Sequence, residues 1–293
     1  MHDKTAIVLA GGGSLGAVQV GMLQAVTEAE VAIDLVVGAS VGAINGAYFA
    51  STPTAAGAAQ LAELWCGLSR QDIFPFSLLA ATRALLQRSG HILGNGGLCR
   101  MIQAALPVSR LEDCALPLHV VTTDLLSGAE VLLSHGDILQ ALLASAAIPL
   151  VYPPVEIEGR LLMDGGVASN TPIASAVALG AQRILVLPTG FGCACKAPPR
   201  GVVALALHTI NLLSMRQLVR DIELHAEQAR IHVAAPLCPL GVSVFDFTQT
   251  RSLIERARLQ TQAWLESDGL QQTGVPESLR AHLHADMDPQ EMP

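Results

Sequence analysis

The pentapeptide Gly38-Ala39-Ser40-Val41-Gly42 holds the side chain with the clearest chemical potential in this sequence. A serine between two glycines has the spacing of the G-x-S-x-G nucleophile elbow, a tight turn that holds the hydroxyl clear of its own backbone. An apolar segment precedes the pentapeptide and a helix-like segment follows it, as the motif requires. The pattern therefore predicts Ser40 as a nucleophile. The alternative is that Gly38 and Gly42 serve close packing of a helix on a strand and that Ser40 is incidental.

A serine nucleophile needs a base, and Asp164 is the candidate. A carboxylate can take the proton if burial or its neighbours favour the transfer. The glycines of Asp164-Gly165-Gly166 give the backbone freedom that a functional turn demands, although the same residues also suit a plain hairpin turn. Histidines follow later in the chain, at positions 208, 225 and 232, but the first two lie in a long helical run and none lies in a marked loop. We expect them to be helix-surface or core residues.

A glycine-rich loop with the sequence GGGSLG occupies residues 11–16. It matches the dinucleotide fingerprint G-x-G-x-x-G, but the acidic residue that would hold a ribose should follow the second strand, and Asp34 lies at its start. Backbone N–H groups at a helix N-terminus serve equally well for a developing oxyanion. We therefore predict an oxyanion hole formed by Gly11, Gly12 and Gly13, with Gly16 supporting the motif.

The elements around these motifs predict an α/β fold. A strand at 5–10 leads through the glycine loop to a helix at 14–29, and a strand at 34–37 leads through the elbow to a second helix. Two successive βα units imply a parallel sheet. Paired strands are expected at 118–123 and 131–134.

Further along the chain, a hairpin of 155–157 with 161–163 delivers Asp164, and a strand is expected at 184–187. The other predicted elements are helices at 55–68, 138–147, 172–179, 204–226 and 249–266 and a strand at 231–234, with an irregular cap between residues 72 and 106. We predict one domain over residues 1–268, with the core motifs in 5–190, and a polar, flexible tail over 269–293.

Composition limits the classes of partner. Apolar residues make up 51% of the 293 residues and charged residues 14%, which implies a large core or apolar surface left for a lipid phase. The net charge of -8 comes without a basic block, so no nucleic-acid partner is expected. The sequence shows no signal peptide and no spanning segment, so the predicted location is the cytoplasm, with peripheral membrane association left open. Phe74, Phe76, Leu78 and Leu79 are candidates for an acyl-binding surface or for cap packing.

Taken together, these blocks resemble the patatin-like phospholipase family, bacterial branch. The resemblance rests on the glycine loop, the elbow and the Asp-Gly-Gly block in the right order, and on the stretch 144–154, ASAAIPLVYPP, which is similar to the segment that leads to the family's Asp-Gly-Gly. It implies a three-layer fold with a mainly parallel central sheet. It also implies a Ser-Asp dyad at Ser40 and Asp164, and an oxyanion hole in the glycine loop. One departure is Leu15, where the family often has Arg or Lys.

The resulting functional prediction is a serine lipid acyl-hydrolase, of phospholipase A, lysophospholipase or carboxylesterase type, that uses neither metal nor cofactor and acts on a lipid or other acyl-ester substrate. Three alternatives stay open. An acyltransferase or thioesterase would use the same site with another acceptor, a nucleotide-binding oxidoreductase would bind NAD(P), and a non-catalytic lipid-binding scaffold would not be labelled at Ser40 by a fluorophosphonate.

Overall fold

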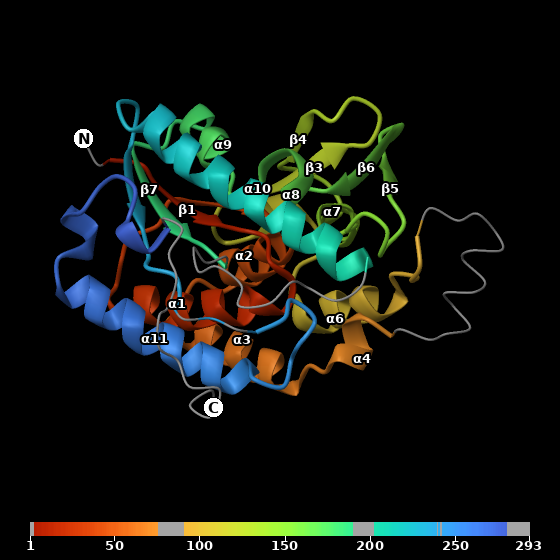
Figure 1. Cartoon of the computed structure of the whole chain (residues 1–293), viewed down its shortest axis with the longest axis horizontal. Coiled ribbons are helices and arrows are strands. Elements are labelled where there is room, and N and C mark those ends of the chain that lie inside the picture. The colour runs from red at the N-terminus through yellow and green to blue at the C-terminus, as the bar shows by residue number, and fades with distance from the viewer. Residues whose placement is uncertain (1–2, 76–90, 190–201, 239, 241, 280–293) are drawn as a thin grey trace.

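The central element is a mixed sheet covered by helices on both faces (Figure 1). The computed structural model describes residues 3–75, 91–189, 202–238, 240 and 242–279. The sheet has eight strands in the order β5-β6-β3-β2-β1-β7-β8, and β4 pairs with β3 off this path. Pairs among β1, β2, β3, β7 and β8 are parallel, and those that involve β4, β5 or β6 are antiparallel. The predicted α/β fold with a mainly parallel sheet is confirmed.

The strand bounds agree closely with the sequence-based ones. The strands are β1 (Thr5–Leu9), β2 (Leu35–Ala39), β3 (Leu118–Asp124), β4 (Glu130–Leu133), β5 (Val155–Ile157), β6 (Arg160–Asp164), β7 (Arg183–Leu187) and β8 (Arg230–Val233). The parallel strands are nearly continuous apolar runs, as expected for strands that are buried on both faces.

Strand β3 brings the two predicted catalytic segments together. β4 and β2 both pair with residues 120 and 121 of β3, so they must lie on its opposite edges. β4 and β6 both pair with residues 122 and 123, so β6 lies on the same edge as β2. Along that edge Ala39 is opposite Val121 and Asp164 is opposite Thr122. Strand β6 therefore pairs with β3 just beyond the point where β2 ends, which brings Asp164 next to Ser40, the residue after Ala39.

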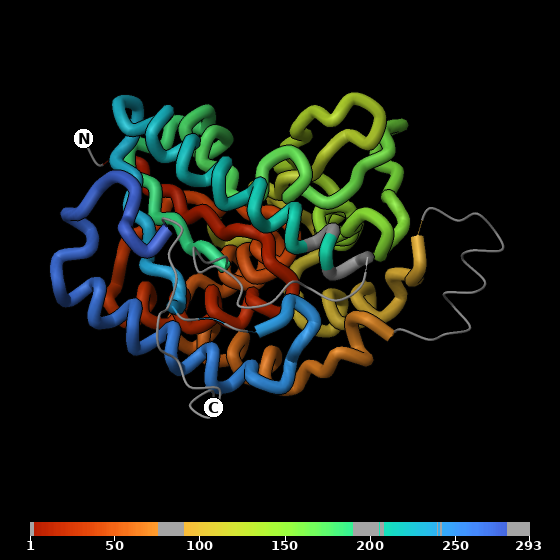
Figure 2. The backbone as a smooth tube through the Cα atoms, viewed as in Figure 1, coloured from red at the N-terminus to blue at the C-terminus, as the bar shows by residue number. Residues whose placement is uncertain are grey.

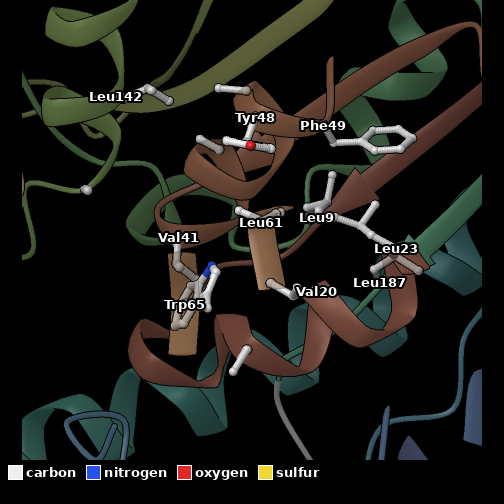
Figure 3. Packing of buried hydrophobic residues seen from close by; sticks show 14 of the residues in the cluster. Leu9, Val20, Leu23, Val41, Tyr48, Phe49, Leu61, Trp65, Leu142 and Leu187 are labelled. Atoms are coloured by element: carbon white, nitrogen blue, oxygen red, sulfur yellow. The ribbon is translucent and has the colours of Figure 1, made fainter. Parts of the chain in front are cut away.

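The protein has two hydrophobic cores, and alternate residues of β1 contribute to different ones. Ile7 and Leu9 join the larger one, with α1 (Gly16–Glu28), α2 (Val41–Ser51), α3 (Ala55–Gly67) and α11 (Thr250–Glu266). Ala6 and Val8 join the smaller one, with α9 (Ile173–Ala178) and α10 (Val202–His225). Figure 2 shows α11, in blue, lying along α1, in red, from opposite ends of the chain. Figure 3 shows the larger core from close by, with Leu9, Val20 and Leu23 between the sheet and α1.

The remaining helices are short. They are α4 (Arg70–Ile73), α6 (Gly96–Ala105), α7 (Ile138–Ser145) and α8 (Gly166–Ser169), with 3-10 turns η1 (Gly13–Leu15) and η2 (Leu111–Asp113). The predicted irregular cap therefore contains helices α4 and α6. Phe74 is buried, whereas Phe76, Leu78 and Leu79 lie outside the described residues.

The C-terminal segment continues to pack after α11. Residues 269–279, which the sequence assigned to the tail, form the 3-10 turns η3 (Gly269–Gln271) and η4 (Glu277–Leu279), and Leu279 is buried against the smaller core. The carbonyl of Gln272 accepts a hydrogen bond from the His232 ring. Residues 280–293 lie outside the described residues. Within the described ranges, no helix combines the length and the apolar character needed to cross a membrane.

Candidate active site

Ser40 occupies a sharp turn between β2 and α2. Its backbone has φ 53° and ψ -128°, a conformation that is strained for a residue with a side chain. The turn is tight enough to exclude a side chain at Gly42, because a Cβ there would lie 2.6 Å from the carbonyl oxygen of Ala10. Helix α2 begins at the next residue, and the Ser40 carbonyl accepts hydrogen bonds from the N–H groups of Ala43 and Ile44. The geometry is that of a nucleophile elbow.

A buried serine holds this turn in place. The N–H of Ser40 donates to Oγ of Ser145 at 2.9 Å, and the same hydroxyl donates to the carbonyl of Val121 at 2.6 Å. Ser145 is the last residue of α7 and is fully buried. Its hydroxyl therefore connects the strained backbone of Ser40 to the strand that also pairs with Asp164.

Asp164 accepts a hydrogen bond from Ser40. The two side chains meet at 2.6 Å, from Oγ of Ser40 to Oδ2 of Asp164. The other carboxylate oxygen, Oδ1, accepts from the N–H of Gly166 at 2.8 Å. Burial raises the pKa of Asp164 to about 6, against the hydrogen bonds from Ser40 and Gly166, which lower it. Asp164 is therefore ionised at neutral pH and still basic enough to take a proton.

The glycine loop approaches Ser40 closely. A Cβ added at Gly11 would lie 3.1 Å from Cβ of Ser40. The N–H of Gly11 donates to the carbonyl of Asn170 at 3.0 Å, so this donor is already used. Among the described residues, the N–H groups of Gly12 and Gly13 have no hydrogen-bond acceptor. Of the three glycines predicted for an oxyanion hole, Gly12 and Gly13 thus have N–H groups that are not already engaged, and the prediction itself remains untested.

Distant residues fix the loop. The carbonyl of Gly11 accepts hydrogen bonds from Nδ2 of Asn170 at 3.4 Å and from Oγ1 of Thr189. Residues before α11 hold its other end, because the N–H of Ser14 donates to the carbonyl of Val244 at 2.9 Å. The loop therefore depends on three segments that are remote from it in the sequence.

Sequence reasoning missed these supporting residues. Ser145 lies in the stretch 144–154 that carried the family resemblance, so a signal for it was present. Asn170 is a polar residue six positions after Asp164, at the end of α8, and that position was the signal available. Thr189 follows β7 without any motif.

A buried polar network ties the loop to helix α2. Nε1 of Trp65 donates to Oδ1 of Asn45 at 2.8 Å, and Nδ2 of Asn45 donates to Oε1 of Gln19 at 3.0 Å. Nε2 of Gln19 then donates to the carbonyls of Ala10 and Leu187, at 2.8 and 2.9 Å. The side-chain polar groups of Trp65, Asn45 and Gln19 all have hydrogen-bond partners, as most buried polar groups do. The network links α3, α2 and α1 to the residue immediately before Gly11.

A large apolar cavity opens beside Ser40. Its volume is about 1160 Å³. Gly13, Ser40 and Val41 lie at one end of it, and the rest of the wall comes mainly from α2, α3, α4 and α6, including Tyr48, Leu61, Trp65, Ile73, Phe74, Leu98, Met101 and Phe247. Figure 3 shows Val41 next to Trp65 in this region. A long hydrocarbon chain fits a wall of this character.

Other candidates from the sequence do not contribute to the site. Oδ2 of Asp34 accepts from the N–H of Thr5 at 2.7 Å, at the N-terminal ends of β1 and β2, whereas the glycine loop follows the C-terminal end of β1, so the position of Asp34 does not suit a ribose. The His225 ring contacts Gln228, and the His232 ring contacts the carbonyl of Gln272. Leu15, where the family often carries a cation, is buried in the larger core.

Comparison with known proteins adds a family to this geometry. A family model described as patatin-like phospholipase matches residues 7–177, more than half of the chain. The match includes the glycine loop, the elbow and Asp164. It ends before Thr189 and the residues around Val244 that support the loop.

Curated relatives are larger proteins. An uncharacterized NTE family protein of Mycobacterium tuberculosis is 29% identical over 280 residues, which cover 89% of this chain and 46% of that protein. Patatin-like phospholipase domain-containing protein 6 of Homo sapiens is 31% identical over 190 residues, which cover 64% of this chain and 13% of that protein. The chain therefore spans less than half the length of these relatives.

Among solved structures, human GIVD cytosolic phospholipase A2 in complex with methyl gamma-linolenyl fluorophosphonate aligns with a TM-score of 0.49 and 12% identity, over 92% of this chain and 58% of that one. VipD from Legionella pneumophila aligns with a TM-score of 0.47 and 15% identity, over 91% of this chain and 67% of that one.

Proposed function

The chain belongs to the patatin-like phospholipase family, and from that premise we propose that it is a serine lipid acyl-hydrolase that cleaves carboxylic esters through Ser40 and Asp164. The observation that carries the proposal is the 2.6 Å hydrogen bond between Oγ of Ser40 and Oδ2 of Asp164, at the end of an apolar cavity. A nucleophile in contact with a buried base is the arrangement that acyl transfer needs.

In the first step Asp164 accepts the proton of the Ser40 hydroxyl while Oγ attacks the ester carbonyl. The carbonyl oxygen takes up negative charge, and the N–H groups of Gly12 and Gly13 stabilise it by hydrogen bonding. As the tetrahedral intermediate collapses, the bond to the leaving alcohol breaks, and Asp164 returns the proton to that alcohol. An acyl group then remains bonded to Oγ of Ser40.

In the second step Asp164 takes a proton from water, and the resulting hydroxide equivalent attacks the acyl carbonyl. The bond to Oγ breaks, the fatty acid leaves, and Ser40 regains its proton. The N–H of Gly166 keeps the carboxylate of Asp164 oriented through both steps, since it bonds the oxygen that does not face Ser40.

The apolar wall of the cavity supports a long-chain acyl group as the part of the substrate that binds beside Ser40. The substrates expected on this basis are phospholipids, lysophospholipids and long-chain esters. A soluble alcohol or amine could replace water as the acceptor in the second step, which would make the protein an acyltransferase, and a thioester could replace the ester in the first.

The test is acyl release from short p-nitrophenyl esters, lysophospholipids, diacyl phospholipids and acyl-CoA, with native protein, Ser40→Ala and Asp164→Asn side by side. The proposal predicts release from at least one oxygen ester, and a loss of about 10³-fold or more in each variant. Release that survives Ser40→Ala would overturn it. Preference for acyl-CoA would favour the thioesterase alternative, and absence of release from every ester together with absence of labelling at Ser40 would favour a lipid-binding scaffold.

A further inference from the structure

The turn between β3 and β4 presents leucines beyond the level of Ser40. Strands β2 and β3 are parallel and in register, with Ala39 opposite Val121, yet β3 continues through Asp124. Each residue of a strand advances about 3.3 Å, so β3 reaches about 10 Å further than β2 on the edge where β2 ends at Ser40. Leu125 and Leu126 follow, and Leu126 is 85% exposed.

This turn is held rigidly. Oδ1 of Asp124 accepts hydrogen bonds from the N–H of Leu126 at 3.1 Å and from the N–H and hydroxyl of Ser127 at 2.8 and 2.9 Å. The N–H of Leu125 donates to the carbonyl of Leu161 on β6 at 2.8 Å. The Asp124 side chain and the backbone of Leu161 therefore hold this turn, in which Leu125 is 41% exposed and Leu126 85% exposed.

The N-terminal half of α10 extends past the same end of the sheet, where the parallel strands have their C-termini. This helix connects the parallel strands β7 and β8, so it runs opposite to them, and its C-terminal end lies where β8 begins. The C-terminal half packs on the sheet through Leu218 and Ile222. Nε2 of Gln217 donates to the carbonyl of Ala168 in α8, and Leu205 lies about 18 Å further along the helix. Figure 1 shows this N-terminal end far from β7.

The overhanging half of α10 carries exposed leucines. Leu205, Leu212 and Leu213 are each more than half exposed. Arg216 follows on the same face of the helix, one turn closer to the sheet, and it is exposed as well. From the N-terminal end of α10 toward the sheet, the exposed leucines therefore come first and Arg216 follows.

Helix α8 fills the space between these two elements. The N–H of Ala168 donates to Oγ1 of Thr123 on β3, and its carbonyl accepts from Gln217 on α10. Val167, next to it, is exposed. Exposed apolar side chains on three neighbouring elements therefore lie near the end of the sheet that carries Ser40, and α8 begins two residues after Asp164. We use the name apolar rim for Leu125, Leu126, Val167, Leu205, Leu212 and Leu213.

We propose that the apolar rim docks the protein on the surface of a neutral phospholipid bilayer, with the end of the sheet that carries Ser40 toward the lipid. The inference rests on the proposed function, because an acyl-hydrolase with a long apolar cavity must collect chains from an aggregate of lipid. A protein with net charge -8 is repelled by anionic lipid, which favours a neutral surface. Arg216, one turn from Leu212 and Leu213 on the exposed face of α10, is a cation next to the rim.

The test measures binding to phosphatidylcholine vesicles by flotation, in a Ser40→Ala background so that no lipid is consumed. The experimental variant is Leu212→Ser/Leu213→Ser, whose leucines are 51% and 60% exposed. The matched control is Leu224→Ser/Leu259→Ser, 60% and 52% exposed, at the other end of α10 and on α11 in the opposite layer. Leu126→Ser tests the turn independently.

We expect the parent to float with the vesicles, Leu212→Ser/Leu213→Ser and Leu126→Ser to bind at least tenfold more weakly, and the control pair to bind as the parent does. Equal binding by all variants would overturn the inference, as would a parent that stays in solution. It would also be overturned if light scattering showed a dimer that the rim substitutions dissociate, because the rim would then be an interface with a second copy.

A second measurement separates this inference from the proposed function. With Ser40 intact, the rim variants should hydrolyse a soluble short-chain ester at the parent rate and vesicle lipid at least tenfold more slowly. If no ester is cleaved at all, the proposed function fails, but the flotation result with Ser40→Ala remains interpretable. Equal losses on soluble and vesicle substrates would contradict the rim's role.

Discussion

Two turns flank the Ser40 hydroxyl, and they are held by different parts of the chain. The elbow is fixed by its own pentapeptide, by the first turn of α2 and by the hydroxyl of Ser145. The glycine loop is fixed by Asn170, Thr189 and the backbone around Val244. Thr189 and Val244 lie beyond residues 7–177, where the family model ends.

A short motif is therefore enough to specify most of the elbow, whereas the glycine loop needs residues far from it in the sequence. The elbow holds the proposed nucleophile and contacts the proposed base, so changes there should alter how Ser40 loses its proton. The loop holds the N–H groups that are proposed to stabilise the oxyanion, so changes there should alter charge stabilisation alone. The two kinds of loss can be told apart by their dependence on pH.

With Ser40 and Asp164 both in place, the largest expected effect on the rate comes from pH itself. Because Asp164 must be ionised to act as a base and burial raises its pKa to about 6, kcat/KM should fall about tenfold per pH unit below that value. A soluble ester assayed between pH 4 and 8 should show a loss of about 100-fold at pH 4. Circular dichroism at pH 4 provides the control that the fold persists. A rate that is constant down to pH 4 would contradict the role of Asp164.

Ionisation of Asp164 raises the reaction rate but lowers the stability of the fold. The folded-state pKa of Asp164 is raised above the ordinary 3.8, so folding favours the protonated form, and that stabilisation is lost as pH rises through about 6. Asp164→Asn keeps a neutral group at all pH values. It should therefore be more stable than the native protein at pH 8, by up to about 2–3 kcal/mol, with the gap closing near pH 4. Urea unfolding at both pH values measures this.

A smaller loss is expected on the loop side. Asn170→Ala combined with Thr189→Val removes both side-chain donors to the carbonyl of Gly11, so the loop should shift and weaken the oxyanion contacts. We expect kcat to fall 10- to 100-fold by the same factor at every pH, since Asp164 is untouched. Thr27→Val is the control, because its hydroxyl bonds only within its own helix. A loss that varies with pH would break the distinction between the two turns.

Ser145 provides the corresponding test on the elbow side. Ser145→Ala leaves the N–H of Ser40 and the carbonyl of Val121 without their shared partner, at a cost of about 1–3 kcal/mol in unfolding free energy. The rate of ester cleavage should fall about tenfold, and Ser145→Thr should recover part of it. Ser214→Ala, another buried hydroxyl, should leave the rate unchanged. An unaffected rate in Ser145→Ala would show that the elbow needs no outside support.

The smallest effect is expected at Trp65, whose hydrogen-bond network runs through Asn45 of α2 and Gln19 of α1 to Ala10, the residue before the glycine loop. Trp65→Phe leaves Oδ1 of Asn45 without its donor but keeps an aromatic ring in the cavity wall. We expect kcat to fall about threefold to tenfold by the same factor for short and long acyl chains, because the change acts through Gln19 and the loop. Assays on esters of increasing chain length measure it. A loss confined to long chains would assign Trp65 to the cavity alone.

The sequence was sufficient for the strands, for the longer helices outside the cap and for the family because these depend on local patterns. The apolar runs at 5–10 and 34–37 form β1 and β2, and the predicted family is confirmed by the model that matches residues 7–177. The position of Asp164 beside Ser40 was expected from motif order, but its cause was not. That cause is the strand register. β2 pairs with β3 as far as Val121, and β6 pairs with the same side of β3 from Thr122 onward.

The residues that support the glycine loop could not be predicted either, because they too depend on how distant strands and segments pair. Thr189 and Val244 reach the loop only because β7 lies next to β1 and because the segment before α11 returns to the start of α1. Contacts of this kind depend on how distant segments pair, and no local periodicity encodes them. The engagement of the Gly11 N–H by Asn170 belongs to the same class.

The most direct test of the proposed site is covalent labelling. Native protein, Ser40→Ala and Asp164→Asn would each be incubated with a long-chain alkyl fluorophosphonate and examined by intact-protein and peptide mass spectrometry. We predict a single adduct on the peptide that contains Ser40 in native protein, none in Ser40→Ala, and labelling slowed by about 10³-fold in Asp164→Asn. An adduct on another residue, or undiminished ester cleavage in protein that is not labelled at Ser40, would contradict the account.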